Sequence, residues 1–222
     1  VVSRFGEASE LALREQVARA LISKGITLRQ LGRSEEAIEV DDSVVSRFGE
    51  ASELALREQV ARALVSKGIT LRELGRREEA IEVYDSVVSR FGEATELALQ
   101  EQAVHAEMRK ADALVESGQI YEAESVLRSG IKRLPQRAGL WNSLGNLLLD
   151  AKGDPAGAEL AYLQGLSVAD SDDTLAVLHA NCAYVLALHI GDHQRAQEHI
   201  QRALAKDVNN VTDAGRYLLT AL

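Results

Sequence analysis

Residues 35–64 read EEAIEVDDSVVSRFGEASELALREQVARAL, and residues 78–107 read EEAIEVYDSVVSRFGEATELALQEQAVHAE. The octapeptide VVSRFGEA begins at positions 1, 44 and 87, so the passage returns with a period of 43 residues. Units 1–43 and 44–86 differ only at Ile22/Val65, Gln30/Glu73, Ser34/Arg77 and Asp41/Tyr84. A fixed period of this length is typical of repeat proteins, in which each unit stacks on its neighbours.

Each 43-residue unit predicts two helices. Apolar residues recur near helical spacing from Leu54 to Leu71, which predicts a helix over about residues 51–74, ended by Gly75. A second helix is expected over about residues 77–91, with glutamates in its first turn and Gly92 ending it in left-handed backbone. Neither strand alternation nor a two-residue hairpin signal is present. The predicted fold class is all-α.

Composition and charge restrict the classes of function. The 222 residues are 46% hydrophobic and only 4% aromatic, so Leu, Val, Ile and Ala must build the core. A net charge of -9 argues against nucleic acid as a partner. The single cysteine, Cys182, fits a reducing compartment, and with no visible signal peptide it predicts a cytoplasmic protein. No uninterrupted apolar run approaches the length of a membrane span, so no membrane partner is expected.

The second half of the chain carries a related motif. Residues 138–162, AGLWNSLGNLLLDAKGDPAGAELAY, contain Trp141-x2-Leu144-Gly145 and then Ala158-x3-Tyr162. This pattern resembles the signature of the tetratricopeptide repeat family, W-x2-L-G-x2-Y followed by A-x3-F and P. Alanines at the matching position recur at spacings of 43, 43, 35 and 38 residues, at Ala37, Ala80, Ala123, Ala158 and Ala196.

The resemblance implies a right-handed superhelical solenoid of antiparallel helix pairs. One solenoid over residues 1–222 is expected, with long units over 1–129, near-standard units over 130–210 and the start of a further or capping helix over 211–222. The family unit is shorter by about nine residues, which we assign to a longer first helix. Residues 1–5 resemble the end of a preceding helix, and both ends look uncapped, which predicts head-to-tail self-association.

By the same resemblance, the protein is a non-catalytic scaffold that binds a peptide or protein segment in a concave groove, with acidic segments as candidate ligands. The first helix of each pair would line that groove. The candidate groove residues are Arg19, Arg29, Arg62, Arg72, His105, Arg109, Asn142, Asn146 and Asn181. One alternative is that the arginines only solubilise the helices and pair with glutamates such as Glu15 and Glu58. The alternative function is a structural spacer or self-associating array.

Catalytic and metal-binding chemistry lacks a matching pattern. His179, Cys182, His189, His193 and His199 cluster near the C-terminus, but His189 and His193 flank a turn at Gly191 and are not a ligand pair on one helix. No HExxH, CxxC, P-loop or GxGxxG motif occurs. Lysines needed for a carboxylate clamp of the family's chaperone-binding type are also missing beside the asparagines. We therefore predict no enzyme, cofactor or metal.

Asp41 stands where the second unit has Tyr84. It shares a helical stripe with Ala37, Val44 and Phe48, so it should lie where an aromatic ring fills the space between helices. A carboxylate there either pairs with an arginine such as Arg14 or Arg57 or is desolvated with a raised pKa. We expect it to make the first unit less stable than the second.

Overall fold

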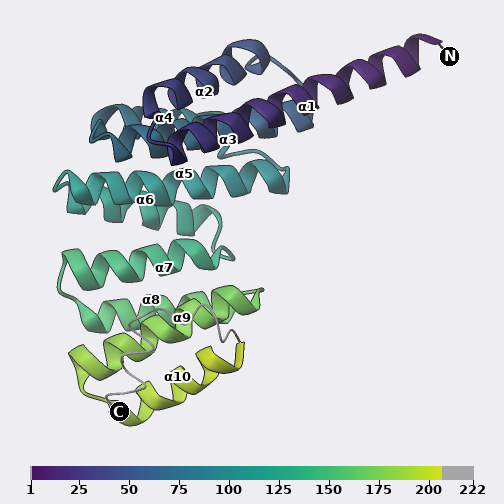
Figure 1. Ribbon diagram of the computed structural model, residues 1–222. Coiled ribbons are helices and arrows are strands. Elements are labelled where there is room, and N and C mark those ends of the chain that lie inside the picture. The colour runs from purple at the N-terminus through teal and green to yellow at the C-terminus, as the bar shows by residue number, and fades with distance from the viewer. Residues whose placement is uncertain (1, 207–222) are drawn as a thin grey trace. The chain divides into compact units, whose positions relative to one another are not determined.

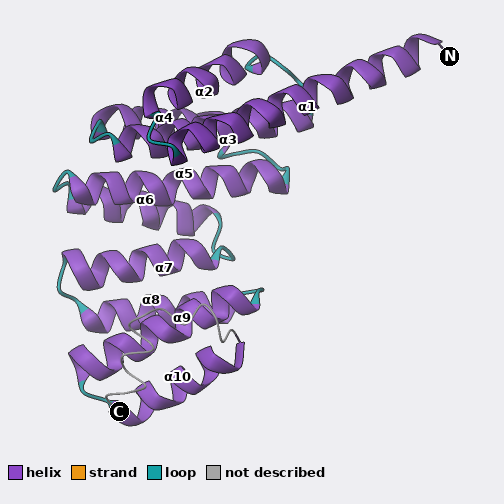
Figure 2. Ribbon diagram, in the orientation of Figure 1, coloured by secondary structure: helices purple, strands orange, loops and turns teal. Residues whose placement is uncertain are grey.

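The computed structural model describes residues 2–206, and it describes side chains from residue 10 onward. Every regular element in that range is helical, which confirms the all-α prediction (Figures 1 and 2). The α-helices are α1 (Val2–Gln30), α2 (Ser34–Phe48), α3 (Leu54–Glu73), α4 (Arg77–Phe91), α5 (Leu97–Glu116), α6 (Ile120–Arg133), α7 (Ala138–Asn146), α8 (Pro155–Val168), α9 (Asp172–Val185) and α10 (His193–Lys206). The expected helix at 211–222 lies outside the described residues.

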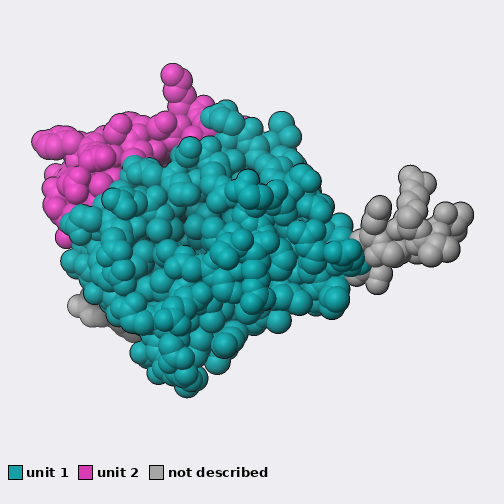
Figure 3. Space-filling view, turned by 90° about the horizontal axis from the view of Figure 1, so that it is seen from above, with its two compact units in different colours: residues 1–113 teal, residues 114–222 magenta. Residues whose placement is uncertain are grey.

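The chain divides into two compact units, residues 1–113 and 114–222 (Figure 3). In the first, α1 packs on α2 and α3, and α3 packs on α2 and α4. In the second, α7 packs on α8, α8 on α9, and α9 on α10. The arrangement of the whole chain as one solenoid stays a prediction.

Tight glycine turns join the two helices of each pair. Five glycines have φ between +63° and +83°, a region that only glycine enters without strain: Gly32, Gly75, Gly118, Gly153 and Gly191. Each precedes an alanine of the repeated motif by five residues, so the turn and the packing contact recur together. The expectation for Gly92 was wrong, because its φ of -62° and ψ of -32° are right-handed.

The repeated motif is a contact between a small residue and a ring. A Cβ on Gly68 would clash with the ring of Tyr84, and one on Gly145 would clash with the ring of Tyr162. Both rings are buried. The missing side chain thus lets the first helix approach the second closely enough for the ring to fill the gap.

The starts of α3 and α1 differ from the prediction. Residues 51–53 belong to the loop before α3, so the extra length of the 43-residue unit is divided between loop and helix. The prediction for residues 1–5 was wrong, because α1 is one uninterrupted helix from Val2. The Glu, Ala and Leu residues of this segment favour helix.

In the second unit, π-helical turns end two of the first helices. Segment η1 (Leu147–Ala151) extends α7, and η2 (Leu186–Ile190) extends α9. Together α9 and η2 form one stretch, Asp172–Ile190, that is long and apolar enough to cross a membrane by length and composition alone. Sequence inspection missed this stretch. Many of its apolar side chains, including Leu178 and Leu186, are buried in the core, which accounts for its hydrophobicity.

Asp41 lies in the position predicted for an aromatic residue. It is fully buried on α2, and a Cβ built on Gly25 of α1 would lie 3.1 Å from its Oδ1, as Gly68 lies against Tyr84. Neither carboxyl oxygen has a hydrogen-bond partner. Burial raises the pKa of Asp41 to about 7; Ser66 and Arg29 nearby offset this in part without closing a hydrogen bond.

The arginines expected beside Asp41 are engaged elsewhere. Arg14 Nη1 lies 3.3 Å from Glu53 Oε1, and Arg57 Nη1 lies 3.0 Å from Glu96 Oε1. The Asp41 carboxyl group is therefore desolvated with a raised pKa, and it is not paired with Arg14 or Arg57.

We expect Asp41→Tyr to stabilise the protein by about 1–3 kcal/mol, because it removes a buried unpaired carboxyl group and refills the space beside Gly25. Thermal and urea unfolding would measure the change. Asp41→Phe is the matched variant, since the Tyr84 hydroxyl is itself buried without a partner. A lower midpoint for both variants would show that the carboxylate has a stabilising partner.

The same carboxyl group predicts a pH dependence. Its pKa is raised from 3.8 to about 7 in the folded protein, so the fold binds this proton more tightly than the unfolded chain does. Its contribution to stability is complete below about pH 4 and is lost as pH rises through 7. The advantage of Asp41→Asn over the parent should therefore grow by roughly 1 kcal/mol or more between pH 5 and pH 8. Glu39→Gln, at an exposed position on α2, should show no such growth.

Equivalent glycines in the two near-identical units should respond differently to substitution. Gly68→Ala forces a methyl group into the ring of Tyr84 and should destabilise by about 2 kcal/mol or more. Gly25→Ala meets only the Asp41 carboxyl group at 3.1 Å and gains helix propensity, so its cost should be clearly smaller. Equal losses in denaturant titrations would contradict the assigned contacts.

Candidate functional site

The arginines predicted to line a groove lie on the first helices of the first unit. Arg19 is exposed on α1 and pairs with Glu15 of the same helix at 2.5 Å. This is the contact expected if the arginine only solubilises its helix. Arg62, its counterpart on α3, is exposed and makes no hydrogen bond or ion pair with another described residue.

The other arginines of this row also pair with carboxylates, and those of Arg29 and Arg72 belong to the following repeat. Arg29 Nε lies 3.9 Å from Glu73 Oε2, and Arg72 Nη1 lies 3.2 Å from Asp112 Oδ2. Arg109 Nη1 also lies 3.2 Å from Asp112 Oδ2, so one carboxylate bridges two arginines. Arg29 and Arg72 therefore link successive repeats, and Arg62 is the arginine of this row that no described carboxylate neutralises.

His105 is exposed on α5 beside this row. Partial desolvation of the ring, together with the Arg109 guanidinium, lowers its pKa. The lowered pKa favours the neutral imidazole, which makes His105 a poorer partner for an acidic ligand than a cation would be.

The asparagines lie in the second unit and divide into two roles. Asn181 Nδ2 on α9 donates to Asn142 Oδ1 on α7 at 2.8 Å. Asn146 instead accepts a hydrogen bond from the Tyr162 hydroxyl at 2.7 Å, so it serves the packing between α7 and α8. The structure brings two of the three predicted asparagines together.

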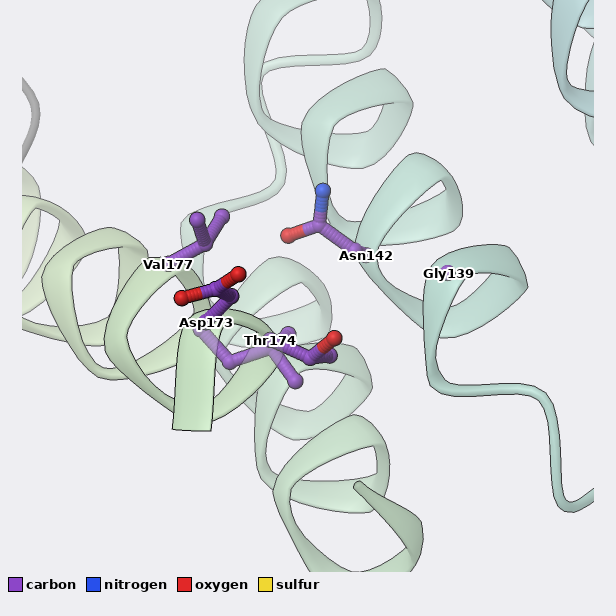
Figure 4. Close-up of a pocket in the computed structure, with 6 residues that line it drawn as sticks. Gly139, Asn142, Asp173, Thr174 and Val177 are labelled. Carbon is purple, nitrogen blue, oxygen red and sulfur yellow. The ribbon is translucent and has the colours of Figure 1, made fainter. Parts of the chain in front are cut away.

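A pocket of about 240 Å³ lies between α7 and α9, and Asn142 is one of the residues that line it (Figure 4). It is lined by Gly139, Asn142, Asp173, Thr174, Val177 and Leu178. Val177 and Leu178 supply the apolar side chains of this lining. Asp173 is exposed at the rim.

The start of α9 fixes this pocket. Ser171 caps the helix by accepting a hydrogen bond from the Thr174 backbone amide at 3.2 Å. Its hydroxyl also donates to Thr174 Oγ1 at 2.8 Å, which holds that side chain in the lining. Sequence reasoning missed Asp173, Thr174 and Val177. The capping sequence Ser171-Asp172-Asp173 would have located the helix start, but no motif marks the hollow itself.

The asparagine pair has unused hydrogen-bonding capacity. After the bond between them, Asn142 Nδ2 can still donate and Asn181 Oδ1 can still accept. A peptide group needs one acceptor and one donor for its N–H and C=O. The pair can therefore bind one backbone amide of an extended segment, next to a pocket that receives a side chain.

Of the histidines near the C-terminus, His179 and His199 lie together, whereas His189 and His193 are exposed; Cys182 is buried. His179 Nδ1 lies 3.0 Å from His199 Nδ1, and burial, followed by His199 and Arg202, lowers the pKa of His179 to about 4. Burial also raises the pKa of the Cys182 thiol to about 12, so it is unreactive. Over residues 2–206, no group of three or more His, Cys, Asp or Glu side chains is placed to hold a metal ion.

Comparison with known proteins supports the helix-pair repeats. Residues 61–91 and 108–174 match family models described as tetratricopeptide repeat. No curated protein matches the chain significantly.

Solved structures share the fold at low sequence identity. The thermophilic TPR protein TTC0263 of Thermus thermophilus is 19% identical, with 92% of this chain and 98% of that chain covered and a TM-score of 0.61. BtubC from P. vanneervenii is 17% identical, with 90% and 85% covered and a TM-score of 0.67. MamA from Desulfovibrio magneticus RS-1 is 20% identical, with 87% and 96% covered and a TM-score of 0.54.

The comparisons confirm the all-α solenoid class predicted from the sequence. They do not identify a 43-residue variety of the repeat, which rests on the sequence period and the structure. Proteins with this family of repeats typically act as non-catalytic protein-interaction scaffolds. The two model matches identify tetratricopeptide repeats within residues 61–91 and 108–174, and the solved structures show that the fold is that of tetratricopeptide repeat proteins.

Proposed function

We propose that the protein is a scaffold that binds an extended segment of a partner protein on the face of the second unit formed by α7 and α9. The Asn142–Asn181 pair beside the pocket carries this proposal, because it offers one donor and one acceptor next to an apolar hollow. Backbone hydrogen bonds of this kind give affinity, and the pocket gives selectivity among side chains.

The pocket favours a small apolar side chain over an acidic one. Its walls include Val177 and Leu178, and its volume of about 240 Å³ suits a side chain rather than a second helix. The Asp173 carboxylate at the rim repels an acidic residue and tolerates a basic one. The preference for acidic ligands expected from the sequence is therefore not proposed for this pocket.

A contact with acidic segments is proposed only at Arg62 in the first unit. The remaining arginines of that row have carboxylates within 4 Å, so a ligand would have to displace an existing ion pair to use them. One exposed cation contributes little affinity by itself.

Self-association is the second candidate function. It is favoured over a plain spacer by apolar side chains of α1 that are exposed, among them Leu13 and Val17.

A peptide array probed with the full chain would test the α7–α9 site. We expect Asn142→Ala and Asn181→Ala to weaken the best-binding peptides by roughly tenfold each, because each loses a hydrogen bond to the peptide backbone. Gln164→Ala, at an exposed position on α8, is the matched control and should bind as the parent does. Unchanged binding by both asparagine variants, with their unfolding midpoints preserved, would rule out this face.

A further inference from the structure

One face of α1 is exposed although its counterpart on α3 is buried. Leu13 is 66% exposed and Val17 is 37% exposed, whereas Leu56 and Val60, 43 residues later, are 0% and 1% exposed. The same contrast holds for Gln16 and Gln59, Ala20 and Ala63, and Thr27 and Thr70. Because units 1–43 and 44–86 are nearly identical, the covered face of α3 shows directly what would cover α1.

The face of α3 is covered by the helix pair that precedes it, in a register fixed by charges. Lys67 Nζ on α3 lies 2.6 Å from Asp42 Oδ1 on α2. Glu53, at the start of α3, pairs with Arg14 on α1 at 3.3 Å.

Both contacts recur one period later. Lys110 Nζ lies 2.7 Å from Asp85 Oδ1, and Arg57 pairs with Glu96 at 3.0 Å. The stacking of one 43-residue repeat on the next therefore has a defined geometry, which occurs twice within residues 1–113.

On α1 the matching charges have no such partners. Lys24 corresponds to Lys67 and Glu10 to Glu53; both are exposed, and neither forms an ion pair or hydrogen bond with another described residue. Lys24 interacts electrostatically with Glu36 of its own helix pair, as Lys67 does with Glu79, but the contact equivalent to Lys67–Asp42 is absent from the described residues. The aspartates that could bind Lys24 in this geometry, Asp42 and Asp85, are already paired. The complement of this face must come from outside residues 2–206.

We propose that this face of α1 docks a partner helix pair of the same 43-residue type, one that lies outside residues 2–206. The second helix of that pair would bring an aspartate, at the position of Asp42, to Lys24. Its first helix would bring an arginine, at the position of Arg14, to Glu10. Its apolar residues would cover Leu13 and Val17, as α1 and α2 cover Leu56 and Val60. The proposal is independent of the α7–α9 site.

The α10 end of a second copy is a poorer occupant. Aligned through Ala37 and Ala196, the position of Asp42 falls on Gln201 of α10. A neutral amide cannot supply the charge that Lys24 lacks. Charge complementarity therefore favours a unit that resembles α1 and α2 over the α10 helix of a second copy.

The probe is a copy of residues 1–43 joined ahead of residue 1 of the full chain, so that docking occurs within one molecule. Hydrogen exchange would be followed over residues 10–24. We expect exchange there to slow by roughly tenfold or more relative to the parent, because docking suppresses local opening of α1. Exchange within 172–190 of the second unit should not change.

A charge swap tests the register. Asp42→Lys in the added copy faces Lys24 and should abolish most of the protection, and Lys24→Asp in the host should then restore it. Glu39→Lys in the added copy is the matched control, since Glu39 is exposed and makes no ion pair with a described residue. An added copy that is folded but leaves α1 unprotected would overturn the proposal. Dimerisation of the parent chain in sedimentation would also overturn it, if Leu13→Glu then abolished both the dimer and the hydrogen-exchange protection of α1, because a second copy would already cover this face.

Discussion

The close contact between a glycine on one helix and a ring on the next is the constraint on which the rest of this structure depends. Gly68 against Tyr84 and Gly145 against Tyr162 set how closely the helices of a pair approach. That distance allows the alanines of the second helices to be fully buried and lets the glycine turns close. A repeat built on this contact leaves an outer surface that only a neighbouring unit can cover, so stacking follows from the packing inside each pair.

Stacking also determines which charged residues remain for a ligand. Carboxylates of one repeat reach arginines of the repeat before it, at Glu73 and Asp112, and the cationic row becomes part of the joints between units. Glu73 is one of the four differences between the near-identical units, with Gln30 at the earlier position. In residues 114–222 the candidate site has the Asn142–Asn181 amide pair, whereas the row in residues 1–113 has ion pairs. An amide can exchange its hydrogen-bond partner for a peptide backbone at little electrostatic cost.

Much of the fold could be predicted because it depends on local spacing. The period, the glycine turns, the small-residue contacts and the bounds of α4 follow from residues that lie near one another in the sequence. The start of α1 and the backbone of Gly92 could not be predicted, since both depend on what packs beside them. The candidate site was likewise predicted only in part, since the family resemblance pointed to Asn142 and Asn181. The carboxylate partners of Arg29 and Arg72 and the pocket beside Thr174 could not be predicted, because they depend on how neighbouring helices pack.

Asp41 and the exposed face of α1 show the two consequences of near-identical repetition. A repeated sequence gives each unit the same packing surfaces, so any difference in environment can be assigned to position rather than to residue type. Leu13 and Leu56 are the same residue in the same motif, and only the presence of a preceding helix pair separates an exposed side chain from a buried one. At Asp41 the environment matches that of Tyr84 but the residue differs. The free energy of burying an unpaired carboxyl group is therefore lost at a position whose surroundings fit an aromatic ring. The first 43-residue repeat therefore combines an unpaired carboxyl group between α1 and α2 with an uncovered outer surface, and a helix pair that docks on α1 would stabilise this repeat.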